Sequence, residues 1–257
     1  MDGESVTRSP LGDQIFEILR ERITHFQLSP GEHLDIRAVA EELGTSAIPV
    51  RDGLKRLLER GLVTHVPGGG YDVVRLSLED MKSIFEFREV LELLAVETSI
   101  NNIPTEVLSD LVSRNERLYP LVDKLNTTGV DDEVDIELHR KCIVGCAYNR
   151  FITETYERLY ELISIAKNWL HRYPDVIVEH REILESLLRR DLEATKRTLR
   201  DHLRKTSEAC LKALQLSYEQ QGSQTGEAAG TEAVAWRSSK AEPDAQLIEE
   251  NLSGGAL

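Results

Sequence analysis

The segment 30–73 constrains the fold of this 257-residue chain more than any other part, because it pairs two short helical patterns with a glycine-rich hairpin. Apolar residues recur at helical spacing over 36–43, and the Gly-Thr-Ser run at 44–46 contains residues that end one helix and cap the next. A second apolar stripe follows at helical spacing: Val50, Leu54, Leu57 and Leu58. We therefore expect two short helices joined by a tight turn, with the second beginning near Ala47.

A β-ribbon is expected directly after these helices. The β-rich runs 62–66 and 71–74 flank Pro-Gly-Gly-Gly at 67–70, which predicts a hairpin whose glycines let the backbone approach phosphates or a minor groove closely. An amphipathic helix over 11–26 precedes the motif, after an arm over 1–10. Three helices and a glycine-tipped ribbon in this order are typical of a winged helix-turn-helix.

The second helix of the motif presents polar side chains opposite its apolar stripe. Four of them are well placed to contact a duplex: Thr45, Ser46, Arg51 and Lys55. A recognition helix meets base edges mainly through its N-terminal turn, which is where these residues begin. The alternative is that the cations here, together with Arg56 and Arg60, only solvate a helix surface, as most charge runs do. The turn and the ribbon around them favour DNA binding.

The charge balance argues against strong non-specific DNA binding. Residues 1–77 contain nine Lys or Arg against twelve Asp or Glu, a net charge of −3, and 35–61 contain five of each sign. Any positive face must therefore come from segregation of charges in space. We expect modest non-specific affinity and dependence on a homodimer for tight binding to operator DNA.

Length and composition indicate two domains. A chain of 257 residues with 40% hydrophobic and 30% charged residues is ordinary for a helical protein with two cores. The formal net charge of −14 argues against a general binder of nucleic acid or membrane surfaces. No apolar run approaches about 18 residues, the start has no signal-peptide pattern, and the three cysteines suit a reducing compartment. A cytoplasmic protein without a membrane partner is expected.

From Ser77 to about Leu216 the sequence has helical patterns and no strand pattern. A capping pattern at 77–80 opens the first of six predicted helices: 78–101, 104–126, 131–147, 149–172, 175–189 and 191–217. Short loops between them predict an antiparallel bundle. The expected fold is mainly α, with a winged helix-turn-helix domain over 1–77 and an all-helical domain over 78–217.

The remaining residues, 218–257, change in composition. Gln, Gly, Ser, Thr, Ala and Glu dominate, and 219–257 hold seven acids against two bases. This composition predicts a disordered acidic tail. The alternative is an extra helix that docks on the body of the protein.

Four residues of the helical region carry nitrogen and oxygen donors at positions that face a core. Asp135 and His139 are four residues apart, which places them on one face of a helix. His180 and His202 each lie in the middle of a predicted helix, flanked by apolar positions. Donors on three inward faces of a bundle suit a divalent transition metal, with Zn(II) first and Ni(II), Mn(II) or Fe(II) as alternatives. Taken singly, each histidine is more simply explained as an interior residue.

The N-terminal motif resembles the GntR family of bacterial transcription regulators. The matching residues are Pro30-Gly31-Glu32, Leu34, Val39-Ala40, Leu43-Gly44, Thr45-Ser46, Pro49-Val50-Arg51, Leu54, Leu57 and Gly61-Leu62-Val63. The resemblance implies a dimer that reads an operator, with Arg37 and Arg51 as its recognition arginines and residues 65–70 as the wing. The expected DNA-binding residues are Arg37, Thr45, Ser46, Pro49, Arg51, Lys55, His65 and Gly69. Ala47 departs from the family, which usually has arginine there, so base readout at this position is expected to differ.

The helical region resembles the effector domain called FCD in the FadR-like branch of that family. In this branch an Asp and a His four apart, and two later histidines, bind a metal; the matching residues are Asp135, His139, His180 and His202. The resemblance extends to Arg88 with Glu92 and to residues 147–149. It implies that the helical domain over 78–217 serves metal and effector binding and dimerisation. A small carboxylate effector is expected at the metal, with Arg88 and Asn149 as candidates for a second contact. Arg88 could equally pair with Glu92 on its own helix.

Three functions remain open from the sequence. The first is a regulator whose effector shifts the dimer contacts and therefore the spacing of its two DNA-binding domains. The second is a metalloenzyme. The absence of an H-E-x-x-H motif argues against it, as does the position of Glu179, about 100° around the helix from His180. The third is a constitutive DNA-binding protein with a purely structural metal. We favour the first and expect no enzyme activity.

Overall fold

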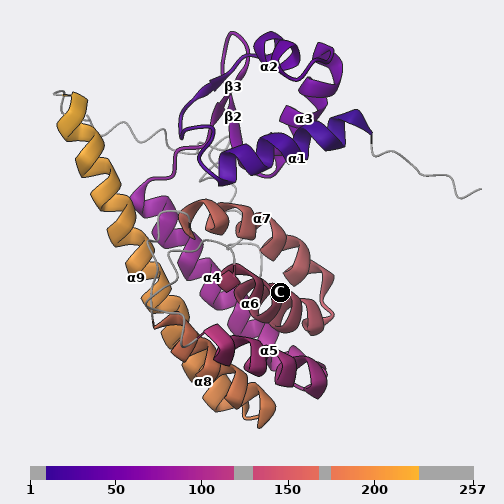
Figure 1. Cartoon of the computed structure of the whole chain (residues 1–257), viewed down its shortest axis with the longest axis vertical. Coiled ribbons are helices and arrows are strands. Elements are labelled where there is room, and N and C mark those ends of the chain that lie inside the picture. Colours follow the sequence, from indigo (N-terminus) through magenta and orange to yellow (C-terminus); the bar gives the residue numbers. More distant parts are fainter. Residues whose placement is uncertain (1–9, 119–129, 168–174, 226–257) are drawn as a thin grey trace, which may run out of the picture. The chain divides into compact units, whose positions relative to one another are not determined.

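The computed structural model describes residues 10–118, 130–167 and 175–225 (Figure 1). These residues form a small antiparallel sheet with three helices, followed by a mainly helical region. None of the helices described is both long and apolar enough to cross a membrane. The fold is therefore mainly α, as the sequence predicted.

The first part of the chain forms the predicted winged helix-turn-helix. Its elements are α1 (Leu11–Thr24), β1 (His33–Leu34), α2 (Ile36–Glu42), α3 (Ala47–Glu59), β2 (Val63–His65) and β3 (Tyr71–Val73). Strand β3 lies between the other two, pairing antiparallel with both, and β2 and β3 form the predicted ribbon. Strand β1 was not predicted from the sequence, because a strand of two residues has no periodicity to detect.

Helix α3 packs against α1 through a stripe of fully buried side chains: Val50, Leu54 and Leu57. Gly53 lies on the same side, and a Cβ atom there would be 2.9 Å from Ile15 Cγ2 and 3.1 Å from the Phe16 backbone nitrogen. Glycine is therefore required for the two helices to approach this closely. The packing fixes which face of α3 remains exposed.

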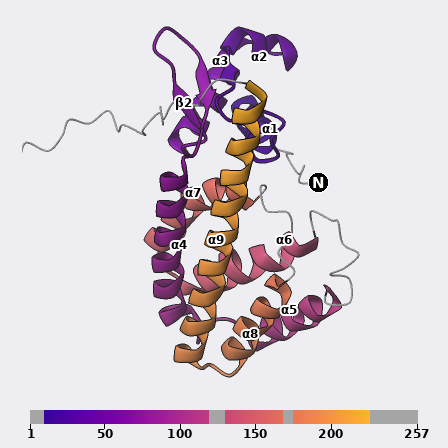
Figure 2. The same cartoon turned by 90° about the vertical axis from the view of Figure 1, so that its left-hand side faces the viewer.

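Eight elements are described in the helical region, within residues 78–118, 130–167 and 175–225. They are α4 (Leu78–Ser99), α5 (Thr105–Leu118), α6 (Val130–Asp135), the π-helix η2 (Ile136–Val144), the 3₁₀ turn η3 (Gly145–Ala147), α7 (Arg150–Lys167), α8 (Val176–Leu188) and α9 (Leu192–Thr225). Helix α9 runs alongside α4, where Arg204 pairs with Glu89 (Figures 1 and 2). Asn115 of α5 donates a hydrogen bond to the Ile177 carbonyl at the start of α8, 2.8 Å away. The start of α4 carries the predicted capping box between Ser77 and Asp80.

Two helix boundaries differ from the sequence prediction. The segment 131–147 is not one α-helix, because it changes to π-helix after Asp135 and to a 3₁₀ turn after Val144. Helix α9 continues to Thr225, past the expected end at 217, so the first residues of the predicted acidic tail are helical. The rest of the predicted tail, and the predicted helical residues 119–126 and 168–172, lie outside the described residues.

Candidate metal centre and nucleic-acid interface

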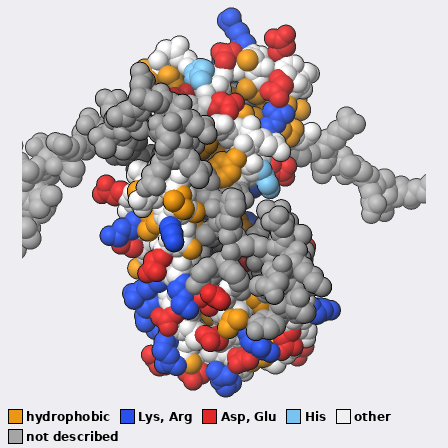
Figure 3. Space-filling model, turned by 60° about the vertical axis from the view of Figure 1, so that its left-hand side comes forward, with side chains coloured by type: hydrophobic (Ala, Val, Ile, Leu, Met, Phe, Trp, Pro, Cys, Tyr) orange, Lys and Arg blue, Asp and Glu red, His pale blue; other side chains and the backbone are white. Residues whose placement is uncertain are grey.

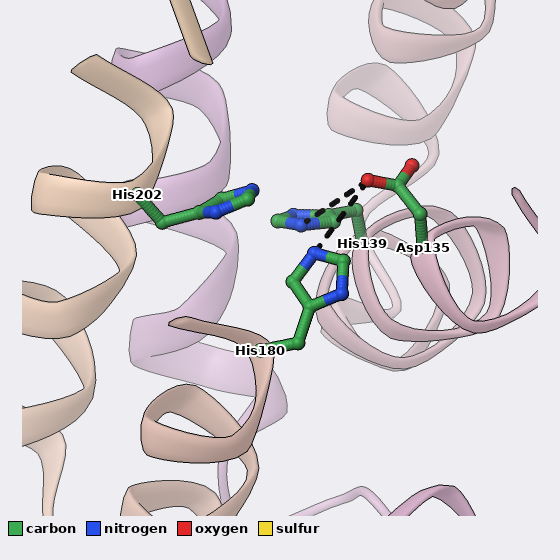
Figure 4. Close-up of side chains that lie close together, drawn as sticks. All are labelled: Asp135, His139, His180 and His202. Carbon is green, nitrogen blue, oxygen red and sulfur yellow. Dashed lines mark ion pairs between the residues drawn. The ribbon is translucent and has the colours of Figure 1, made fainter. Parts of the chain in front are cut away.

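Four buried side chains converge inside the helical region (Figure 4). They come from three places in the chain: Asp135 and His139 from the α6–η2 segment, His180 from α8 and His202 from α9. One ligand atom from each lies within 4.8 Å of the others. Asp135 Oδ1 is 3.8 Å from His139 Nε2 and 3.7 Å from His180 Nε2. The structure thus brings together the four residues singled out as metal ligands from the sequence.

The π-helix η2 carries His139 within this cluster. Short π-helical segments are rare and occur frequently at functional sites. Leu138, directly before His139, is fully buried against the hydrophobic core, as are Ile183 on α8 and Leu199 on α9. The ligand-bearing turns are therefore held by packing on several sides.

Two carboxylates fix the orientation of two imidazoles. His139 Nδ1 lies 2.6 Å from Glu92 Oε2, and His202 Nδ1 lies 2.9 Å from Glu179 Oε2. An ionised carboxylate can only accept, so Nδ1–H is the donor in both rings. In a neutral ring with this orientation Nε2 carries the lone pair, and the Nε2 atoms of His139 and His202 are both buried without a hydrogen-bond partner among the described residues.

This donor set fits a divalent transition metal. Histidines that bind metals usually donate their second ring N–H to a carboxylate or a carbonyl, as His139 and His202 do here. Two atoms bound to one ion at about 2.1 Å are at most about 4.2 Å apart. The four ligand atoms lie within 4.8 Å of one another, so they would have to draw together slightly to form such a shell.

Glu92 lies at the centre of a buried polar network behind His139. Besides the histidine it accepts hydrogen bonds from Arg88 Nε at 2.6 Å and from the Tyr156 hydroxyl at 2.9 Å. Burial favours a higher pKa for Glu92, but Arg88 and His139 outweigh it and hold the pKa well below its usual range. Glu92 therefore stays ionised and able to accept all three bonds.

His202 is held neutral by its surroundings. Burial is the main cause that lowers its pKa to about 4, and the hydrogen bond to Glu179 offsets only part of the effect. Glu179 also forms an ion pair with Lys205, whose Nζ lies 2.9 Å from Glu179 Oε1. His202 and Lys205 together keep the pKa of Glu179 below its usual value, although burial alone would raise it. A neutral imidazole is the form that binds metals.

Arg88 forms the ion pair with Glu92 that the sequence offered as the alternative to an effector contact. Its Nε pairs with Glu92 on the same helix, and its side chain is only 1% exposed. Its Nη1 is buried and has no hydrogen-bond partner among the described residues. The N–H groups of Arg88 Nη1 therefore remain available after the ion pair has formed.

Asn149 does not lie in the buried cluster, contrary to its proposed role as a second effector contact. It is exposed, and its Oδ1 accepts hydrogen bonds from the backbone nitrogens of Phe151, at 3.1 Å, and Ile152, at 3.4 Å. Asn149 thus caps the start of α7. An asparagine directly before a helix is a strong capping signal, and it explains the residue without an effector.

The roles of Glu92, Tyr156 and Glu179 behind the histidines were not predicted from the sequence. Glu92 was noted only as a partner of Arg88, and Glu179 only as an unsuitable general base. The Arg88–Glu92 spacing is a local signal, but the contact from Glu92 to His139 joins residues far apart in sequence and depends on tertiary packing.

The helix-turn-helix exposes most of the residues expected to contact DNA. Arg37, Ser46, Arg51 and Lys55 are exposed, as are His65 and Gly69 of the wing; Thr45 and Pro49 are half-buried. Ser46 occupies the N-cap position of α3, but its side chain makes no capping hydrogen bond. Arg56 has a structural role instead, because it pairs with Asp13 and lies 4.7 Å from the Phe16 ring centroid.

The exposed recognition helix and ribbon, joined to a helical region with a buried donor cluster, define a DNA-binding transcription regulator. Residues 11–73 match the model of bacterial regulatory proteins of the gntR family, and residues 83–205 match the FCD domain. The chain belongs to the GntR family and carries an FCD domain in its helical region.

Individual relatives agree with this assignment. The HTH-type transcriptional regulator YdhC of Bacillus subtilis is 28% identical over 74% of this chain and 86% of its own length. The HTH-type transcriptional repressor RspR of Escherichia coli is 26% identical over 78% of this chain and 89% of its own length. The solved structure of E. coli McbR/YncC shares the fold, with a TM-score of 0.65 and 22% identity over 80% of this chain and 99% of that one. These relatives are transcription regulators, which confirms the prediction that the protein is not an enzyme.

Proposed function

We propose that this regulator binds operator DNA as a homodimer and that a small carboxylate, bound at a metal centre in the helical region, controls its affinity. The observation that carries the proposal is the pair of buried Nε2 atoms of His139 and His202, each with its Nδ1 fixed by an acid. A buried polar atom without a partner costs free energy, so a bound ion would explain why both are retained.

The four ligands of this centre are Asp135, His139, His180 and His202. Three imidazoles and one carboxylate suit Zn(II) first, with Ni(II), Mn(II) and Fe(II) as alternatives. When bound, the ion supplies a positive centre that accepts an oxygen atom of the effector. Glu92 and Glu179 orient the rings, and the surrounding hydrophobic residues limit access of water.

Arg88 is the second contact for the effector in this proposal. A carboxylate prefers an arginine donor in a dry site, because charge-assisted hydrogen bonds are about twice as strong as neutral ones. The buried Nη1 of Arg88 supports this role, since its Nε is already committed to Glu92. Asn149 is not part of the proposed effector site.

The outer face of α4 is the proposed dimer contact. Phe87, Val90 and Leu94 are 46%, 60% and 48% exposed and recur at helical spacing. Elsewhere on the helical region acidic and basic side chains are interspersed over the visible surface (Figure 3). A second copy of the chain is the partner that fits best, because two-fold symmetry lets the same apolar stripe bury itself.

Helix α4 would carry the signal between these sites. Only four residues, 74–77, separate its start from the end of the wing strand β3, and its capping box stiffens the junction. Arg88 and Glu92 lie on its inner face, and the proposed dimer contact lies on its outer face. An effector held by Arg88 would therefore act on the same helix that sets the spacing of the two DNA-binding domains.

In the DNA-binding domain, Arg37 and Arg51 would contact bases. The DNA backbone would be contacted by Thr45, Ser46, Pro49 and Lys55, and the wing over 65–70 would reach the adjacent groove. The roles of Arg37 and Arg51 follow the resemblance to the family, and the exposure of both side chains supports them.

The test is the response of DNA binding to small acids. An operator is first selected from random duplexes with zinc-loaded protein, and binding is then measured with a panel of one- to four-carbon carboxylic acids. We expect one class of acid to change the affinity at least tenfold, and the Arg88→Lys variant to keep its zinc and lose the response, because lysine lacks the Nη1 donor. If no acid changes affinity, and chelation unfolds the protein, the metal is purely structural and the regulatory part of the proposal is wrong.

A further inference from the structure

Ile48 is an unusually exposed apolar side chain on the recognition helix. It is 77% exposed, whereas Val50, Leu54 and Leu57 of the same helix are fully buried. Among the large hydrophobic side chains of the described residues, only Tyr148 is as exposed. Isoleucine is also a weaker helix former than alanine, leucine or lysine. Neither core packing nor helix formation therefore explains an isoleucine here.

The position of Ile48 is the one from which a recognition helix touches bases. It is the second residue of α3, directly after the N-cap region, and so lies in the first helical turn. Arg51 follows it by three residues and is also exposed, so the two side chains lie on neighbouring parts of one surface. Residues in this turn of a helix-turn-helix contact base edges in the major groove.

Ala47, the residue before Ile48, cannot make a polar contact with a base through its side chain. Ala47 carries no hydrogen-bond donor or acceptor in its side chain, and neither does Ile48. This corner of the helix can therefore discriminate bases only by apolar contact. In the major groove, the apolar group on a base edge is the C5-methyl of thymine.

We infer that Ile48 reads the C5-methyl group of a thymine in each half-site of the operator. The inference rests on the proposed function only in taking α3 as the recognition helix, and it is independent of the metal and the effector. Arg51 then supplies the polar part of the same contact surface. Contact of Ile48 with a partner protein instead of DNA is one of the outcomes that the test distinguishes.

The test removes the methyl group and the side chain in turn. Operators are selected from random duplexes with the wild-type chain. For each thymine that the half-sites share, a matched duplex is made in which deoxyuridine replaces only that base. At one position the wild-type chain should bind the deoxyuridine duplex about fourfold more weakly per half-site, the loss expected for one methyl group. Ile48→Ala should bind the two duplexes equally.

Two controls make the result decisive. Ile48→Val keeps a β-branched apolar side chain and should retain most of the preference for thymine. Circular dichroism should find Ile48→Ala folded, because the side chain is exposed. Equal binding of thymine and deoxyuridine duplexes by the wild-type chain at every shared position would overturn the inference, and would point to a protein partner if Ile48→Ala alters regulation but not DNA binding.

The Arg51→Ala variant distinguishes a wrong role for Ile48 from a wrong choice of recognition helix in the proposed function. If Arg51→Ala loses binding to all duplexes while deoxyuridine has no effect on the wild-type chain, α3 is the recognition helix and only the role of Ile48 is wrong. If Arg51→Ala binds normally, α3 is not the recognition helix, and the DNA-binding assignments fail together with the inference.

Discussion

Glu92 and Glu179 each accept a hydrogen bond from the Nδ1 of a clustered histidine, and so decide which ring nitrogen faces the proposed metal. Glu92 is fully buried, and the positive charge of Arg88 beside it keeps it ionised. At the residue scale, the acids behind the histidines are therefore expected to affect metal binding even though they are not ligands themselves.

Glu92→Gln should weaken zinc binding about 10- to 100-fold, the usual cost of losing a carboxylate behind a histidine ligand. It should also lower stability by about 3 kcal/mol or more, because the charge of Arg88 is left buried without its partner. Competition titration with a zinc chelator measures the affinity. Glu89→Gln, on the same helix but paired with arginines near the surface, is the matched control and should bind zinc normally. Equal affinity in both variants would remove Glu92 from the site.

The metal-free protein should lose stability as the pH falls from about 6.5 to about 4. His202 has a pKa of about 4 in the folded protein, against 6.5 ordinarily, so in this range the unfolded chain binds a proton that the folded chain does not. The loss attributable to this residue is about 3 kcal/mol. Urea unfolding at several pH values measures it, and His202→Gln should flatten the dependence. A variant with an unchanged slope would show that other groups are responsible.

At the scale of elements, local patterns predict what depends on neighbours along the chain. The stripe from Val50 to Leu57, the capping residues at Ser77 and Asp80, and the glycines of the wing each act within a few residues, and the corresponding elements form as expected. Strand β1 and the π-helix η2 could not be predicted, because the first is stabilised by pairing with β3 and the second lies in a densely packed core. The same reasoning explains why Asp135 and His139 could be placed on one helix face from their spacing, whereas the resemblance alone did not show that Asn149 is exposed and caps α7.

Gly53→Ala should destabilise the protein by about 1–3 kcal/mol, which is opposite in sign to the usual effect of this substitution within a helix. The added Cβ would meet Ile15 Cγ2 and the backbone of Phe16, and backbone atoms cannot rotate away. Thermal unfolding followed by circular dichroism measures the change. A stabilised variant would mean that α1 and α3 can separate without cost.

At the scale of the whole molecule, α4 connects the proposed metal centre, the proposed dimer contact and the chain leading from the wing.

Val90→Glu should convert the proposed dimer into a monomer, because it places a charge at the centre of the apolar stripe. Sedimentation equilibrium measures the change, and operator affinity should fall with it. Val178→Glu, at a similarly exposed valine on α8, is the control and should remain dimeric. Dimers in both variants would place the interface elsewhere.

Calorimetric titration of the metal-free protein with Zn²⁺ tests the metal centre most directly. We predict one ion per protomer for the wild-type chain, loss of that binding in His139→Ala and in His202→Ala, and full binding in His65→Ala, whose histidine lies on the wing. Stoichiometric zinc in either of the first two variants, or none in the wild-type chain, would contradict the account.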